Sequence, residues 1–117
     1  MIPKGAFLKV ADNSGARLVQ VIGTRFKAAY IGDVVKVAIK DARGGKVQAG
    51  QMRKAVIVEA SKATMRPSGA SFQFLRNACV LLNEKGAPVG NRLRSMLTYE
   101  FIKPRWKRLN LLGRRLF

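Results

Sequence analysis

The stretch Val35-Lys36-Val37-Ala38-Ile39-Lys40 decides the fold class, because its large apolar residues occupy every second position. Successive side chains of a β-strand point to opposite faces, so this spacing predicts one buried face and one face that carries lysines. The pair Gly44-Gly45 follows and indicates a tight turn. The stretch therefore predicts a half-buried strand with a basic outer face.

Similar strand patterns lie on both sides of this stretch. The turn Asp12-Asn13-Ser14-Gly15 separates two of them, and Pro67 and Gly69 suit the tip of a hairpin. We expect strands at residues 6–10, 17–22, 46–48, 55–58 and 78–82, and hairpin arms at 62–65 and 70–74. Short strands separated by glycine turns at intervals of about 8–12 residues are typical of a small all-β barrel or sandwich.

The carboxyl end has a different, helical spacing. Trp106, Leu109 and Leu112 form one apolar stripe, and Pro104 suits the first turn of a helix. We expect one or two short helices that pack on the strands. The prediction is a single domain over residues 1–117, with the barrel at about 1–97 and the helical end at about 98–117.

The charge of the chain indicates a polyanionic partner. Its 117 residues include 23 Lys or Arg, 6 Asp or Glu and no His, which gives a formal charge of +17. Because 48% of the residues are hydrophobic, this is not the composition of a disordered basic tail. No base-reading motif is visible, so recognition through backbone charge and shape is expected. Structured RNA suits that mode best, and duplex DNA stays open.

Other classes of function are disfavoured by the residues present. Without His the usual general base is missing, and Cys79 lies in an apolar run that predicts a buried packing role. Asp33 and Asp41 are interpreted as turn residues at strand ends. We therefore expect no enzyme, no catalytic residue, no metal site and no cofactor. An alternative is a basic membrane-surface protein that acts through an amphipathic helix within residues 103–117.

Two turns could serve either structure or binding. Asp12 and Asn13 suit an ordinary hairpin turn, but the same turn would let backbone N–H groups and Arg17 approach phosphate oxygens together. The glycine-bounded turn at residues 86–92 has the same ambiguity. Phe7 falls in a strand position and is expected in the core.

The segment Val10-Ala11-Asp12-Asn13-Ser14-Gly15-Ala16-Arg17 resembles the amino-terminal signature of the family of the fourteenth protein of the large ribosomal subunit. The resemblance continues through Ile31-Gly32-Asp33-Val34-Val35-Lys36 and through Asn77-Ala78-Cys79-Val80-Leu81-Leu82-Asn83. Because these matches fall in order along essentially the whole chain, chance is improbable.

The resemblance implies a closed five-stranded β-barrel with a projecting hairpin and a helical carboxyl end. It also implies binding to large-subunit rRNA and neighbouring ribosomal proteins, near the face that meets the small subunit. A contact with small-subunit rRNA at a bridge and docking of a ribosome-silencing factor are further implied partners. The implied rRNA contacts are Asn13, Ser14, Arg17, Lys36, Lys40, Lys46, Lys54, Arg66, Arg76, Arg92 and Arg94. The implied protein and subunit interface comprises Thr98, Tyr99, Arg105 and Arg108.

Departures from the family pattern bear on where the protein works. Ser68 stands where the family usually has an Asp, and the tail Gly113-Arg114-Arg115-Leu116-Phe117 is basic where bacterial relatives carry an acid. Divergence of this kind favours an organellar, mitochondrial ribosome over a bacterial one.

Overall fold

The computed structural model describes residues 2–25, 27–61, 64–65, 69, 71–72, 76–94, 97, 101 and 104–112. The strands run in the order β1 (Ile2–Pro3), β2 (Phe7–Val10), β3 (Ala16–Gly23), β4 (Ala28–Ala29), β5 (Val34–Ala42), β6 (Met52–Glu59), β7 (Thr64–Met65), β8 (Ser71–Phe72) and β9 (Ala78–Leu82). A 3-10 helix (Pro104–Trp106) and the helix α1 (Lys107–Leu112) follow them.

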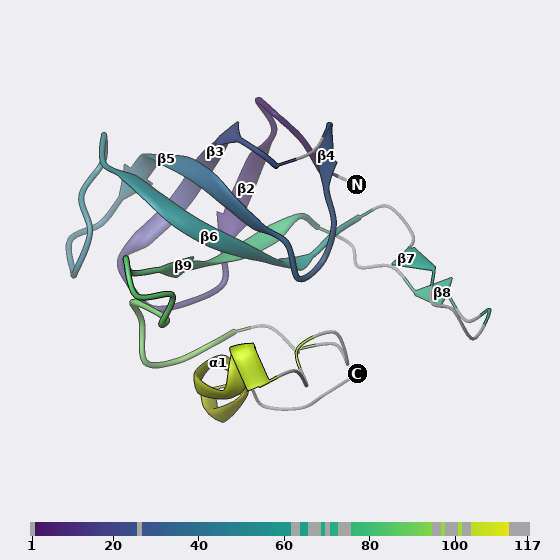
Figure 1. Cartoon of the computed structure of the whole chain (residues 1–117). Helices are drawn as coiled ribbons and strands as arrows, with labels where there is room; N and C mark the ends of the chain where they lie inside the picture. The colour runs from purple at the N-terminus through teal and green to yellow at the C-terminus, as the bar shows by residue number, and fades with distance from the viewer. Residues whose placement is uncertain are drawn as a thin grey trace.

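Five strands close into a barrel in the order β2-β3-β5-β6-β9 (Figure 1). Neighbouring strands are antiparallel except β2 and β9, whose parallel pairing closes the ring. Closure pairs the barrel strands on both sides and so removes the open sheet edges at which chains aggregate. The barrel that the resemblance implied is confirmed.

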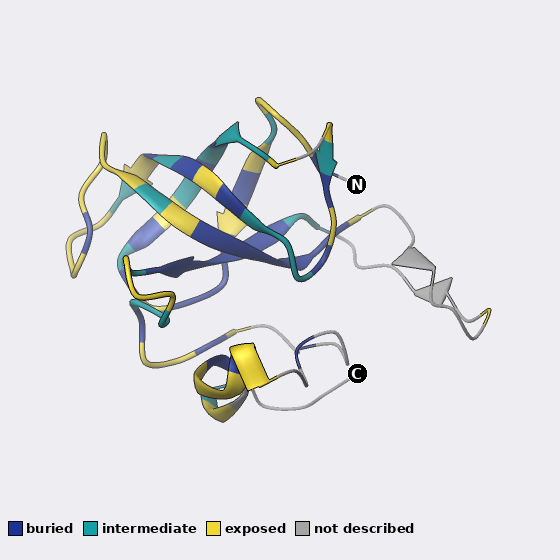
Figure 2. Ribbon diagram, in the orientation of Figure 1, coloured by how far each residue is buried: buried dark blue, intermediate teal, exposed yellow. Residues whose placement is uncertain are grey.

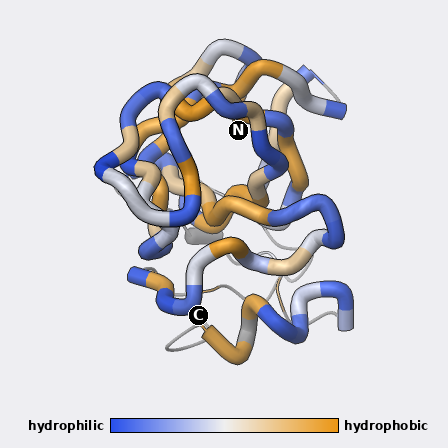
Figure 3. The backbone as a smooth tube through the Cα atoms, turned by 90° about the vertical axis from the view of Figure 1, so that its left-hand side faces the viewer, coloured by the Kyte–Doolittle hydropathy of each residue, from blue (hydrophilic) through white to orange (hydrophobic). Residues whose placement is uncertain are grey.

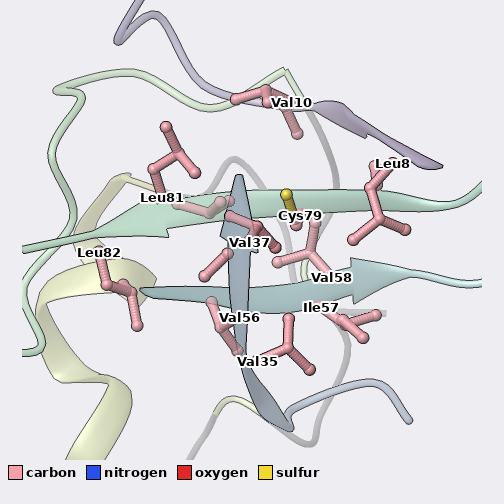
Figure 4. Close-up of a cluster of buried hydrophobic side chains, with 14 of the residues drawn as sticks. Leu8, Val10, Val35, Val37, Val56, Ile57, Val58, Cys79, Leu81 and Leu82 are labelled. Atoms are coloured by element: carbon pink, nitrogen blue, oxygen red, sulfur yellow. The ribbon is translucent and has the colours of Figure 1, made fainter. Parts of the chain in front are cut away.

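The barrel interior is filled by alternate residues of all five strands. The register sets Leu8 opposite Val19, and Val21 opposite Val37, and all four side chains are buried. Figure 4 shows part of this apolar cluster. Cys79 belongs to it, and its burial, followed by the nearby Asp12 carboxylate, raises the pKa of its thiol. Its predicted packing role is confirmed.

The helical end packs where the barrel has a second apolar face. Every residue of β9 is buried, although alternate residues point away from the barrel interior. Trp106 and Leu109 are buried in the same core cluster, and the ring centres of Trp106 and Phe101 lie 5.6 Å apart in an edge-to-face contact. Figure 1 shows α1 on the side of the barrel where β9 lies, beyond the segment that follows β9. The predicted stripe is confirmed at these two positions, while Leu112 is half-buried.

The predicted hairpin is confirmed where the structure describes it. Thr64 pairs with Phe72 and Met65 pairs with Ser71, and these two short strands lie away from the barrel (Figure 1). The remaining predicted residues of the hairpin lie outside the described residues.

Three local features differ from the sequence expectations. Phe7 is 54% exposed, not in the core, because Leu8 and Val10 take the inward positions of β2. The stretch at 46–48 is not a strand, although Val47 is buried. β1 and β4 form a separate two-stranded sheet that was not predicted, since two-residue strands show no periodicity.

Candidate nucleic-acid interface

The first turn holds the loop at residues 43–46 by backbone hydrogen bonds. The N–H of Arg43 donates to the carbonyl oxygen of Gly15 at 2.9 Å, and the N–H of Lys46 donates to that of Ser14 at 2.9 Å. In each of these bonds the donor is the backbone N–H of a basic residue. The turn therefore fixes the points from which two cations extend.

The same turn holds the loop at residues 89–94. The side-chain oxygen of Asn13 accepts the backbone N–H groups of Asn91 at 2.9 Å and Arg92 at 3.2 Å. The Asn13 amide also donates to the side-chain oxygen of Asn91. The N–H of Arg94 donates to the carbonyl oxygen of Ala11 at 2.7 Å. Two further cations are thus fixed by residues 11–15, which we call the organising segment.

Glycines allow the three loops to approach this closely. A Cβ atom added at Gly15, whose φ is +105°, would lie 1.9 Å from the carbonyl oxygen of Gly44. A Cβ atom at Gly90 would lie 2.7 Å from the side-chain oxygen of Asn13. A larger residue at Gly15 would require movement of the loop at residues 43–46, and one at Gly90 would displace at least the Asn13 side chain.

Asp12 ties the organising segment to the barrel. Its buried carboxylate accepts the N–H of Ser14 at 3.1 Å, the hydroxyl of Ser14 at 2.6 Å and the N–H of Leu81 in β9 at 3.3 Å. The hydroxyl of Ser14 is therefore fully buried and donates within the protein. Of the predicted rRNA contacts in this turn, the structure leaves the side chains of Asn13 and Arg17 exposed.

Five cations gather around the organising segment, and all of them are exposed. We call this set the three-loop basic cluster: Arg17, Arg43, Lys46, Arg92 and Arg94. The ammonium of Lys46 also donates to the carbonyl oxygen of Val89 at 3.1 Å, which links the second and third loops. Because four of the five backbones are hydrogen-bonded in place, less conformational entropy is lost when the side chains engage phosphates.

Four of these cations are among the predicted rRNA contacts, and Arg43 is not. The sequence feature that could have identified Arg43 is its position immediately before the Gly44-Gly45 turn. A basic residue beside a turn of this kind has the same pattern as Arg17 beside the first turn. The pattern alone could not show that the two turns meet.

Three predicted contacts lie on the outer barrel wall. Lys36 of β5 and Lys54 of β6 are direct cross-strand partners, and both are exposed. Lys40 is exposed further along β5, toward the three-loop basic cluster. From Lys36 to Arg43 the chain advances about 23 Å, at about 3.3 Å per residue. The wall therefore carries a basic stripe that extends well beyond the cluster.

The other predicted residues are not brought to this place. Arg76 forms an ion pair with the largely buried Glu59, with its Nε atom 2.6 Å from a carboxylate oxygen, so part of its charge is used within the protein. Arg105 and Arg108 are exposed at the helical end, and the guanidinium of Arg105 lies 4.8 Å from the ring centre of Trp106. Arg66, Thr98 and Tyr99 lie outside the described residues.

The described part of the chain shows neither a metal site nor a membrane-spanning helix. No group of three or more His, Cys, Asp or Glu side chains there could hold a metal ion. None of the helices described has the length and apolar composition that a membrane-crossing helix needs.

Two comparisons with known proteins identify the family of the chain. The family model described as "Ribosomal protein L14p/L23e" matches residues 1–116. The chain is also similar to the large ribosomal subunit protein uL14 of Aquifex aeolicus (strain VF5), with 44% identity over 104 residues, which are 86% of each chain. Matches of this extent leave no part of the barrel or of the basic loops unaccounted for. The chain therefore belongs to the ribosomal protein L14p/L23e family.

Proposed function

We propose that this protein is a structural constituent of the large ribosomal subunit that binds rRNA through the three-loop basic cluster. The name of the Aquifex relative supports the subunit. The support for rRNA is the way the organising segment holds the backbones of Arg43, Lys46, Arg92 and Arg94. That arrangement is the observation that carries the proposal.

The cluster suits phosphate oxygens better than base edges. A guanidinium donates two parallel hydrogen bonds to one phosphate, and the cluster brings Arg17, Arg43, Arg92 and Arg94 to one end of the barrel. The backbone-fixed spacing then selects the shape of a folded RNA rather than its base sequence. The protein would act as a rigid clamp between phosphates that the RNA fold brings together.

Further contacts follow from the family resemblance and belong to the same proposal. Lys36, Lys40, Lys54, Arg66 and Arg76 are the additional rRNA candidates. Neighbouring ribosomal proteins, a bridge to small-subunit rRNA and a silencing factor would meet the surface at Thr98, Tyr99, Arg105 and Arg108. This surface would lie toward the small subunit.

The compartment is part of the proposal. The relative with 44% identity is bacterial. The preference for a mitochondrial ribosome rests on Ser68 and on the basic tail at residues 113–117. Fractionation of the source cells decides it, since recovery with the cytosolic or bacterial ribosomes would contradict the organellar assignment.

Binding to deproteinised large-subunit rRNA tests the function. If the chain makes about 6–10 phosphate contacts, the affinity should fall roughly 10³- to 10⁵-fold between 50 and 200 mM salt, because each contact releases condensed counterions. An affinity that does not change with the salt concentration would contradict the proposal. So would the absence of the chain from purified large subunits.

A further inference from the structure

An open hollow of about 660 Å³ lies on the outer wall of the barrel, apart from the three-loop basic cluster. Leu82, the last residue of β9, pairs with Lys54 of β6. Because β6 begins two residues earlier, at Met52, the start of β6 extends past the end of β9. The turn after β9 forms the far side of the hollow, at Asn83 and Glu84. The hollow thus lies beside the part of β6 that has no partner in β9.

The floor of this hollow is apolar. Met52 is 61% exposed, and the lining also includes the half-buried Val34 and the buried Leu82. Figure 2 shows exposed positions only in the first half of β6, whereas the second half of this strand is buried. A flexible thioether adapts to different aliphatic partners and is common at protein-binding surfaces. An aliphatic side chain of a partner would fill this floor, which a sugar-phosphate backbone would not.

The rim of the hollow is cationic. Lys36 and Lys54 lie directly opposite each other across β5 and β6, and like charges in this position destabilise a sheet. Among the described residues that line the hollow, Glu84 is the one acid. A second hollow of about 310 Å³ shares Lys54 and Glu84 and extends to Lys85 and Arg105. A carboxylate placed between Lys36 and Lys54 would relieve their repulsion.

We propose that this hollow binds an extended segment of a neighbouring protein, with an aliphatic side chain on Met52 and Leu82 and an acidic residue between Lys36 and Lys54. This proposal removes Lys36 and Lys54 from the additional rRNA candidates named above, because their partner is then a protein carboxylate and not an rRNA phosphate. The proposal goes beyond rRNA binding, because it uses a different surface and a different class of partner.

Crosslinking from position 52 tests the occupant. The full chain carries benzoylphenylalanine in place of Met52, is assembled into large ribosomal subunits and is irradiated, and the adduct is sequenced. An adduct with a segment of another protein that has an Asp or Glu next to the attachment point supports the proposal. An adduct with RNA, an adduct with residues 113–117 of the same chain, a protein segment without an acid, or no adduct would overturn it.

Binding of the crosslinked segment then tests the chemistry. A synthetic peptide with that sequence is titrated onto the full chain. Met52→Asp, and separately Lys36→Glu with Lys54→Glu, should each weaken its binding by about tenfold or more. Leu111→Asp is the matched control, since Leu111 is 77% exposed and lies outside the hollow, and it should leave the affinity unchanged. Equal affinity for the wild-type chain and Met52→Asp would overturn the proposal.

The two proposals fail separately. Met52→Asp should bind deproteinised rRNA as the wild-type chain does, because Met52 lies outside the three-loop basic cluster. Loss of rRNA binding in that variant would count against a protein partner at the hollow. Failure of the wild-type chain to bind rRNA would count against the proposed function alone.

Discussion

At the scale of single residues, Asn13 positions part of the basic cluster although it carries no charge itself. Its side-chain oxygen accepts two backbone N–H groups of the 89–94 loop, and its amide donates to Asn91. Asn13→Ala should lower the free energy of unfolding by about 1–2 kcal/mol. It should weaken rRNA binding about three- to tenfold, because the backbone of Arg92 must then be ordered on binding, while the bond from Arg94 to Ala11 remains. Equilibrium unfolding and a filter-binding titration measure the two effects.

The salt dependence separates positioning from charge. Asn13→Ala removes no cation, so the slope of log affinity against log salt should match that of the wild-type chain. Asn91→Ala is the control, since both backbone bonds to the Asn13 oxygen remain, and it should bind nearly as the wild-type chain does. A shallower slope for Asn13→Ala would show that a cation such as Arg92 no longer reaches its phosphate at all, which contradicts a loss of ordering alone.

Gly15 is a second residue on which the three loops depend. Gly15→Ala combines an unfavourable φ of +105° with a Cβ atom 1.9 Å from the Gly44 carbonyl oxygen. Gly50→Ala has a similar φ of +90° but meets nothing within 4 Å. In the Gly50 variant, backbone strain should lower the free energy of unfolding by about 1–2 kcal/mol. Gly15→Ala should lower it clearly more in the same thermal or urea unfolding assay. Equal decreases for the two variants would contradict the close approach of Gly15 to Gly44.

Cys79 should make the stability depend on alkaline pH. Burial, and then the Asp12 carboxylate, raise the pKa of the Cys79 thiol above its ordinary value in the folded state. The unfolded thiol releases its proton above a pH of about 8.5–9, whereas the folded thiol keeps it. Above that pH the free energy of unfolding should therefore fall by about 1.4 kcal/mol per pH unit from this group. The decline measured for Cys79→Ala should be shallower, and parallel curves would refute the assignment.

At the scale of elements, the helical end belongs to the barrel core. Trp106 and Leu109 are buried, so the apolar stripe that could have served a membrane surface is already used in packing. Trp106→Ala should lower the free energy of unfolding by about 3–5 kcal/mol. Leu111→Ala, at an exposed position of the same helix, should change it by no more than about 0.5 kcal/mol.

Fluorescence tests the membrane alternative without a variant. Trp106 is the single tryptophan of the sequence, so its emission reports on this packing. The emission maximum should stay unchanged when anionic vesicles are added, because the indole stays against the barrel. A blue shift or a change in quencher access on vesicle addition would show that the helix leaves the barrel for lipid.

The sequence predicted the long elements well because their periodicity reflects burial. Alternation in β5 and the stripe at Trp106 and Leu109 each identify a face that must be covered. The meeting of the loops at 43–46 and 89–94 on the organising segment could not be predicted, since it depends on the register of the closed barrel. Phe7 shows the same limit, because its strand was predicted but the inward face was not.

At the scale of the whole molecule, the apolar interior and the charged surface have separate roles. Figure 3 shows the barrel strands as a ring, with apolar stretches in the ring and the helical end outside it. The interior supplies stability, and none of the Lys and Arg side chains whose burial the structure describes is buried. Membership in a family of structural ribosomal proteins also confirms the prediction that the chain is not an enzyme. A fold that only fixes the spacing of cations is sufficient for such a role.

The most direct test of the central claim compares two variants of equal net charge. Arg43, Lys46 and Arg92 are replaced by Gln in one variant, and Lys4, Lys9 and Lys27, which are exposed elsewhere, are replaced by Gln in the other. The slope of log affinity for rRNA against log salt is measured for both. If the three-loop basic cluster holds rRNA phosphates, the first variant should lose roughly 2–3 from the magnitude of the slope and the second almost nothing. Equal slopes for the two variants would contradict the claim.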